Sequence, residues 1–375
     1  MLSSSFKMHD LGEAKYLLGV EIQRDRKLNT ISLSQSQYAW AVLEHTGMAS
    51  STLVWTPMTH GTTLSRTDLE DNTVLPEILI NNKWVSYLIV ISSLMYLMLE
   101  TCPDLAFSVG TLSHFSASPK TCHWEAAKCV LHYVWATTDI ELQYDRNDVS
   151  MDMDFHGYSN AGWSQNPDNS CSTSGYLFLN NHGAISWSSK QHSMVALSTT
   201  ESEYIRLSLA GQRLAWLHTF FEEIGHPQKG PTILHCDNQA TIILSWDPQF
   251  QAQTKHIQWK YHHVHDDLVA KGEAIIWYVP AGDMVADILT KVLVQEQHWK
   301  FVHAMGLWLC LSGSVKMPTK WPSRVSKDTL AFQGFQRLFP FFWSFQNVPA
   351  LLRFPEEFPC FQNFGNSSSF QRLLI

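Results

Sequence analysis

The stretch Gly157 to Trp163, with the sequence GYSNAGW, decides the fold of the second half of the chain. It closes an alternating segment, Asp152 to Trp163, which predicts a strand. Two further strand-like segments, Gly175 to Leu179 and Ala184 to Trp187, follow after short polar loops. We therefore expect three antiparallel strands here. On its own, Asn160 in such a strand is only a polar residue that needs a hydrogen-bonding neighbour.

After these strands, helices and strands alternate. The expected elements are a long amphipathic helix from Thr199 to Ile224 ended by Gly225, a strand at Thr232 to His235, a helix after Asp237, a helix at Lys255 to Lys271, a strand at Ala274 to Val279 and a final helix beginning at Ala286 to Leu293. This order predicts a mixed α/β sheet with helices packed on it.

The first half reads differently. Lys15 to Ile22 and Thr30 to Leu33 predict two strands, Gln35 to His45 predicts a helix, and the polar stretch from Gly61 to Asn82 predicts a linker. From Trp84 to Thr137 three helical segments follow, broken at prolines. We expect the most apolar run, Tyr87 to Leu99, to be a buried core helix.

The composition sets limits on function. The 375 residues suffice for two or three domains, and the net charge of −8 argues against strong non-specific binding of nucleic acid. The seven cysteines are scattered without any C-x-x-C pair, which favours a reducing compartment. The start of the chain has no apolar signal segment, and Tyr87 to Leu99 is too short for the ~20 residues of a membrane span. We expect an intracellular protein of the cytoplasm or nucleus that does not associate with a membrane. The sequence leaves the oligomeric state open.

Motifs in a fixed order carry a family resemblance. They are Lys7-Met8-His9-Asp10-Leu11-Gly12-Glu13, Tyr16-Leu17-Leu18-Gly19, Thr101-Cys102-Pro103-Asp104, His123-Trp124-Glu125-Ala126-Ala127-Lys128 and Leu131-His132-Tyr133, followed by the region Gly157 to Lys291. The chain thereby resembles the C-terminal part of the Pol polyprotein of Ty1/copia-type retrotransposons. The resemblance implies a reverse transcriptase remnant (1–60), a linker and helical connection (61–148), a ribonuclease H-like domain (150–307) and an unassigned tail (308–375).

The resemblance also implies a site and a reaction. A ribonuclease H cuts the RNA strand of an RNA–DNA hybrid with Mg²⁺ or Mn²⁺ held by carboxylates. The matching positions here are Asn160, Glu203, Asp237 and Asp287, so an amide stands where the family has its first Asp. The Tyr-x-Asp-Asp turn of the polymerase is not in this sequence, so only the nuclease half is a candidate for chemistry.

Several of these residues have simpler interpretations. Asp237 is also a favoured helix N-cap. Glu201 and Glu203 point about 200° apart on a helix, so only one can face a site; Glu203 is the better match, and Glu201 at N3 suits a capping box. Asp283 serves the turn after Pro280.

A group of histidines also invites a metal interpretation. The group His256, His262, His263 and His265 raises the possibility of zinc, but neighbouring histidines diverge on a helix and no cysteine pair supports them. A helix face near substrate, with His256 in a Lys-His pair that the family uses, is the preferred interpretation.

No other acid is expected to replace the missing carboxylate. Asn160 keeps a carbonyl oxygen but no negative charge. Asp154 lies about 20 Å away along a strand that rises about 3.3 Å per residue, Asp152 lies farther still, and Asp168 would need an unusual bend. We expect an impaired nuclease, or alternatively a non-catalytic folded remnant with weak nucleic-acid binding.

A wider pattern favours decay. Residues other than Arg stand where the family usually has Arg, and each is one transition from an Arg codon; they are Cys102, His114, His132, Trp135, Gln253 and His265. Asp to Asn at position 160 is also a transition. The region Phe332 to Phe364 has no clear period, and of a docked tail, an insoluble appendage or sequence never selected to fold, we favour the last.

Overall fold

The computed structural model of the chain describes residues 12–49, 52–66, 73–145, 155–162, 167–192, 199–246 and 272–309. All of them belong to one compact unit, Met1–Gly313. Within it lie two five-stranded sheets and a two-stranded hairpin. Among the described residues, no helix is both long and apolar enough to cross a membrane.

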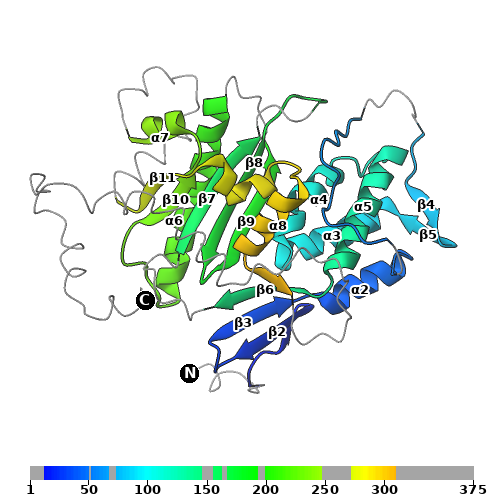
Figure 1. Cartoon of the computed structure of the whole chain (residues 1–375), viewed down its shortest axis with the longest axis horizontal. Helices are drawn as coiled ribbons and strands as arrows, with labels where there is room; N and C mark the ends of the chain where they lie inside the picture. The colour runs from blue at the N-terminus through cyan, green and yellow to red at the C-terminus, as the bar shows by residue number, and fades with distance from the viewer. Residues whose placement is uncertain are drawn as a thin grey trace, which may run out of the picture. The chain divides into compact units, whose positions relative to one another are not determined.

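The second sheet is the mixed sheet that the sequence predicts, with the strand order β11-β10-β7-β8-β9 (Figure 1). Its strands are β7 (Phe155–Gly162), β8 (Thr173–Asn180), β9 (Gly183–Gln191), β10 (Thr232–Cys236) and β11 (Ala274–Tyr278). The pairs β7–β8 and β8–β9 are antiparallel, whereas β10 is parallel to both β7 and β11. Three antiparallel strands followed by alternating helices and parallel strands form a ribonuclease H-like mixed α/β fold.

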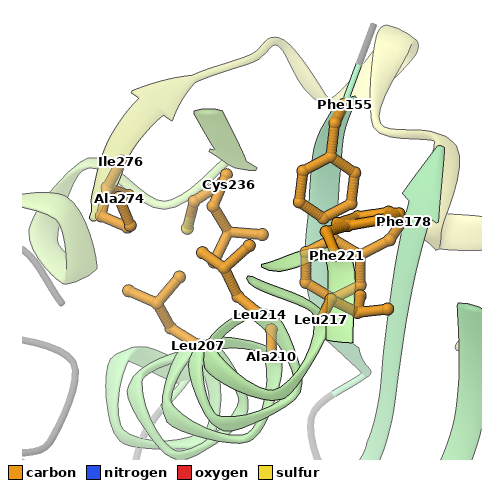
Figure 2. Close-up of a cluster of buried hydrophobic side chains, with 11 residues drawn as sticks. Phe155, Phe178, Leu207, Ala210, Leu214, Leu217, Phe221, Cys236, Ala274 and Ile276 are labelled. Atoms are coloured by element: carbon orange, nitrogen blue, oxygen red, sulfur yellow. The ribbon is translucent and has the colours of Figure 1, made fainter. Parts of the chain in front are cut away.

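Helix α6 (Thr199–Glu223) covers one face of this sheet. Its apolar positions recur every three to four residues, so one side of the helix is buried. Leu207, Ala210, Leu214, Leu217 and Phe221 pack against residues of the strands, as Figure 2 shows. The helix ends before Gly225, whose φ of +81° suits a residue without a side chain.

The strands contribute the other half of this core. Phe155 and Phe178 from β7 and β8 have ring centroids 5.8 Å apart, and Phe155 also meets Phe221 of the helix at 5.1 Å. Between them, Gly157 leaves room for the Phe178 ring, because an added Cβ would lie 2.6 Å from it. The glycine that opens the GYSNAGW stretch is therefore required by packing in this core.

The first sheet is antiparallel, with the order β1-β2-β3-β6-β12. Its strands are β1 (Tyr16–Leu17), β2 (Val20–Asp25), β3 (Thr30–Ser34), β6 (Ile140–Asp145) and β12 (Leu307–Leu309). The helices that follow in this half are α2 (Ser36–His45), α3 (Tyr87–Glu100), α4 (Ala106–Ser113) and α5 (Thr121–Thr137), with the 3-10 turn η1 (Pro103–Leu105) between α3 and α4. The three helical segments expected between Trp84 and Thr137 are confirmed.

Two glycines let the two sheets meet closely. Gly306, with φ +83°, has the Cα of Gly183 and two carbonyl oxygens within 3 Å of where a Cβ would lie. Backbone hydrogen bonds join the segments there: Gln143 N donates to Gly306 O at 2.8 Å, and Ala184 N donates to Met305 O at 3.0 Å. A side chain at either glycine would separate these strands.

Three expectations about local structure are wrong. The single strand expected from Lys15 to Ile22 is split, because Leu18 and Gly19 both adopt positive φ and turn the chain between β1 and β2. The linker from 61 to 82 contains β4 (Glu77–Ile80), which pairs with β5 (Lys83–Ser86). The helix expected from Ala286 is only the 3-10 turn η6 (Val285–Leu289), and α8 begins later (Gln295–Ala304).

Other expectations fall outside the described residues, namely the helix at Lys255 to Lys271 and the tail beyond residue 309. The domain limits at 60, 148 and 307 stay predictions. Strand β6 lies inside the expected connection and β12 crosses the expected end of the nuclease domain, yet both join the first sheet.

Candidate active site

The sheet brings two of the expected residues to one edge. Asn160 lies near the end of β7, where it pairs with Gly175, and Asp237 directly follows β10. Because β7 and β10 are parallel neighbours, their carboxyl ends meet at the same edge, which is where open α/β sheets place their sites. Glu203 comes from the first turns of α6, and Asp287 comes from η6.

Asn160 contacts Asp287 directly, and both side chains are buried. The Asn160 amide nitrogen donates to Asp287 Oδ1 and also lies 3.5 Å from Thr290 Oγ1. Lys291 Nζ binds the second oxygen, Oδ2, at 2.8 Å. Both carboxylate oxygens of Asp287 are therefore occupied by N–H donors of the chain itself.

Glu203 faces the other side of the cluster. Its Oε1 accepts a hydrogen bond from the backbone nitrogen of Ala161 at 2.9 Å, while Oε2 is buried without a hydrogen-bond partner in the described structure. One ligand atom each from Glu203, Cys236 and Asp237 lies within 4.8 Å of the others. Two carboxylates and one thiol therefore meet in this half of the site.

Burial dominates the electrostatics of all three carboxyl groups. It raises the pKa of Glu203 to about 7, against a lowering by the nearby Arg206 charge and a further raising by Asp237 and Asp287. Burial also raises the pKa of Asp237, and it raises that of Asp287 although Lys291 lowers it. The cluster therefore holds negative charge that the surroundings solvate poorly.

Sequence reasoning missed Arg206. This residue on α6 is fully buried, and its Nη2 donates to the carbonyl of Gly175. Arginine in a long helix is usually exposed, so composition gives no reason to place it inside. The signal that was present is spacing: Arg206 lies three residues after Glu203, on the same helix face.

The residues present fit a divalent cation only in part. The unpaired Oε2 of Glu203, together with Asp237, offers hard oxygen ligands of the kind that Mg²⁺ and Mn²⁺ prefer. The Asn160 and Asp287 side does not fit, because an amide N–H occupies Asp287 where a bridging carboxylate would be needed. The donor set therefore suits one cation position rather than a pair.

The other acids considered from the sequence lie elsewhere or outside the described residues. Asp168 accepts hydrogen bonds from Ser65 Oγ at 2.5 Å and from the Arg66 backbone, so it holds that segment and not the carboxylate cluster. Asp283 ends the 3-10 turn after Pro280 and pairs with Lys300 at 2.6 Å.

Seven residues considered above fall outside the part of the chain that the structure describes. They are Asp152, Asp154, the side chain of Glu201, His256, His262, His263 and His265.

The chain is similar to two curated plant transposon proteins. It is 38% identical over 300 residues to the retrovirus-related Pol polyprotein from transposon TNT 1-94 of Nicotiana tabacum, covering 79% of this chain and 22% of that protein. It is 32% identical over 306 residues to the Pol polyprotein from transposon RE2 of Arabidopsis thaliana, covering 82% of this chain and 20% of that protein. The chain belongs to the copia-type retrotransposon Pol polyproteins. It spans about a fifth of the length of these relatives.

Other comparisons add less to this copia-type assignment. No protein-family model matches the chain. Among solved structures, LC11-RNase H1 in complex with an RNA/DNA hybrid is 15% identical, with a TM-score of 0.26, covering 36% of this chain and 93% of that one.

Proposed function

We propose that this copia-type chain carries a ribonuclease H domain whose ancestral reaction, metal-dependent cleavage of the RNA strand in RNA–DNA hybrids, is impaired. One observation carries the proposal: the Asn160 amide donates to Asp287. A carboxylate at position 160 would repel Asp287 and leave both groups open to a cation. The Asn160 amide instead binds the Asp287 carboxylate, so neither side chain is left open to a cation.

The remaining residues keep roles that can be derived from their contacts. Glu203 is fixed through Oε1 by the Ala161 backbone and keeps a buried, unpaired Oε2 among the described residues. Glu203 and Asp237 have ligand atoms within 4.8 Å of each other, and these two would hold a divalent cation. Bound cations supply the attacking hydroxide and stabilise the leaving oxygen in such a reaction. Lys291 opposes the rise of the Asp287 pKa and holds the Asp287 carboxylate through its 2.8 Å ion pair. Asn160 contributes neither charge nor an open oxygen toward Asp287.

A cleavage assay tests the proposal. Purified chain is incubated with a labelled RNA–DNA hybrid and either Mg²⁺ or Mn²⁺, beside the matched variants Asp237→Ala and Asn160→Asp. We expect wild type to cut no faster than Asp237→Ala. We expect Asn160→Asp to raise Mn²⁺-dependent cutting by about tenfold or more, which corresponds to ~1.4 kcal/mol or more of transition-state stabilisation.

If wild type cuts the hybrid robustly and Asp237→Ala abolishes this cutting, the proposal that the nuclease is impaired is contradicted. Circular dichroism of each variant shows whether it is folded. The same assay with single-stranded RNA controls for contaminating nucleases, because those do not require the hybrid or respond to Asp237→Ala.

A second candidate function is a non-catalytic folded remnant that binds nucleic acid weakly. Its support is the contrast between an intact core and a negative charge of −8, which opposes attraction to phosphates. Titrating a labelled hybrid into the chain at two salt concentrations would measure that binding.

We also propose an intracellular location, in the cytoplasm or nucleus. Among the described residues Cys102, Cys122, Cys129, Cys171 and Cys236 are all free thiols, which suits a reducing compartment.

A further inference from the structure

Arg206 is a buried cation next to the carboxylate cluster. Its side chain is fully buried, and of its guanidinium nitrogens only Nη2 has a hydrogen bond, to the carbonyl of Gly175. Nε and Nη1 have no partner among the residues that the structure describes. An arginine recruited only for packing or bridging would have more of its five donors bonded, because each buried unbonded donor is costly.

The position of Arg206 links it to the expected metal ligands. Gly175, which accepts its hydrogen bond, is the residue directly opposite Asn160 in the β7–β8 ladder. Glu203, which has the unpaired buried oxygen, lies one helical turn before Arg206 on α6. Burial lowers the pKa of Arg206 to about 10, and the carboxylates of Glu203, Asp237 and Asp287 oppose this lowering, Glu203 most strongly.

The charges of the cluster are nearly balanced without any metal. Glu203, Asp237 and Asp287 bring three carboxylates, and Arg206 and Lys291 bring two cations. With Asn160 neutral, one divalent cation would already leave the cluster with a net positive charge. In a buried setting, where charges interact more strongly than in water, an adjacent fixed cation lowers the affinity for a second one.

We propose that Arg206 is a resident cation of this site, which takes the electrostatic place of the second divalent metal ion and keeps the site from binding a pair. This proposal deepens the proposed function, since it rests on the cluster being the remnant of a nuclease site. It assigns the loss of metal binding to two positions, Asn160 and Arg206, and not to Asn160 alone. Repair of Asn160 is then necessary but incomplete.

Calorimetric titration with Mn²⁺ at pH 7.5 tests the proposal without relying on cleavage. The proteins are wild type, Asn160→Asp, Asn160→Asp/Arg206→Met and Asn160→Asp/Arg206→Lys. Met has a similar length and no charge, whereas Lys keeps the positive charge and serves as the matched control. We expect the Met double variant to bind Mn²⁺ at least tenfold more tightly than Asn160→Asp, and the Lys double variant to stay within about threefold of Asn160→Asp.

Equal Mn²⁺ affinities for Asn160→Asp and both double variants would overturn the proposal. So would equal tightening by Met and Lys, because that would assign the effect to packing rather than charge. If the Met variant does not fold, Arg206→Gln in the same background replaces it and is read by the same criterion. Cleavage by wild type would contradict the proposed function but leave this comparison of affinities intact.

Discussion

Two buried polar clusters in this molecule differ in how completely their groups are hydrogen-bonded. In the first, Tyr133 Oη donates to Asp104 Oδ2 at 2.7 Å and lies 3.0 Å from His298 Nε2. Because the hydroxyl proton goes to Asp104, His298 must donate from Nε2. Burial lowers the pKa of His298 to about 3, so it remains neutral. In the second cluster, Glu203 and Arg206 keep buried atoms without partners.

The difference separates a cluster that holds elements of the fold together from the candidate site. Asp104, Tyr133 and His298 join α8 to the helices of the first half, and each group is matched to its neighbour. In the carboxylate cluster, by contrast, Glu203 Oε2 and Arg206 Nε and Nη1 have no hydrogen-bond partner among the described residues. Buried polar groups are nearly always paired in native structures, so unpaired ones point to a ligand or to the loss of one.

The largest expected effect comes from a substitution in the hydrogen-bonded cluster of Asp104, Tyr133 and His298. Tyr133→Phe removes one oxygen and leaves the buried Asp104 carboxylate and the His298 N–H without their shared partner. We expect the free energy of unfolding at pH 7.5 to fall by about 3 kcal/mol, since a buried charged group loses its side-chain hydrogen bond and keeps only those from the backbone. Urea denaturation measures it. A loss below about 1 kcal/mol would mean that this cluster is no better satisfied than the other.

The intermediate effect is a dependence of the free energy of unfolding on pH, which comes from Glu203 in the carboxylate cluster. The pKa of Glu203 is raised to about 7 in the folded chain, so between about pH 4.5 and 7 the folded chain holds a proton that the unfolded chain has released. Glu203 therefore favours folding at low pH, and this contribution is lost as pH rises through that window.

Glu203→Gln removes this titration and tests it. We expect the free energy of unfolding of the variant, relative to that of wild type, to rise by about 2 kcal/mol between pH 5 and pH 7. Matched urea melts at both pH values give the difference. A constant difference would show that Glu203 titrates normally and is not confined in a poorly solvated site.

The smallest expected effect comes from an ion pair on the surface, which serves as the reference for the two buried clusters. Lys300 and Asp283 form an ion pair at 2.6 Å, with side chains 41% and 50% exposed. Water can replace either partner, so we expect Lys300→Met to change the unfolding free energy by less than about 0.5 kcal/mol. Thermal melts beside Tyr133→Phe measure it. A larger change would show that deleting any polar contact in this chain is costly, which would weaken the contrast between the two clusters.

Local patterns predicted much of the fold. The alternation in β7, β8 and β9 and the stop at Gly225 follow from side-chain periodicity and from a residue that tolerates positive φ. Strand pairing between distant segments was not predictable in this way. Strand β12 pairs with β6 across more than 150 residues, and nothing in three apolar residues indicates their partner.

The candidate site was predictable where a carboxylate follows a strand or opens a helix. Asn160, Glu203, Asp237 and Asp287 were all named from motifs, and the structure places them in one cluster, while their roles stay predictions. The spacing from Glu203 placed Arg206 on the same helix face, but its burial could not be predicted, because burial depends on how α6 packs on β8, which is a tertiary property. The same holds for the Asn160 amide, whose donation to Asp287 depends on the position of η6.

The meeting of β6 and β12 makes the ribonuclease H-like domain an insertion within the first sheet. Leu307 pairs with Leu142, so the chain leaves the first sheet after Asp145 and returns at an adjacent strand. The two ends of the inserted domain are therefore neighbours in space. A short turn could connect β6 to β12 directly, so the first sheet has no topological need of the domain between them. Changes inside an insert of this kind need not disturb the first sheet, because only the two segments that flank the insert pair within that sheet.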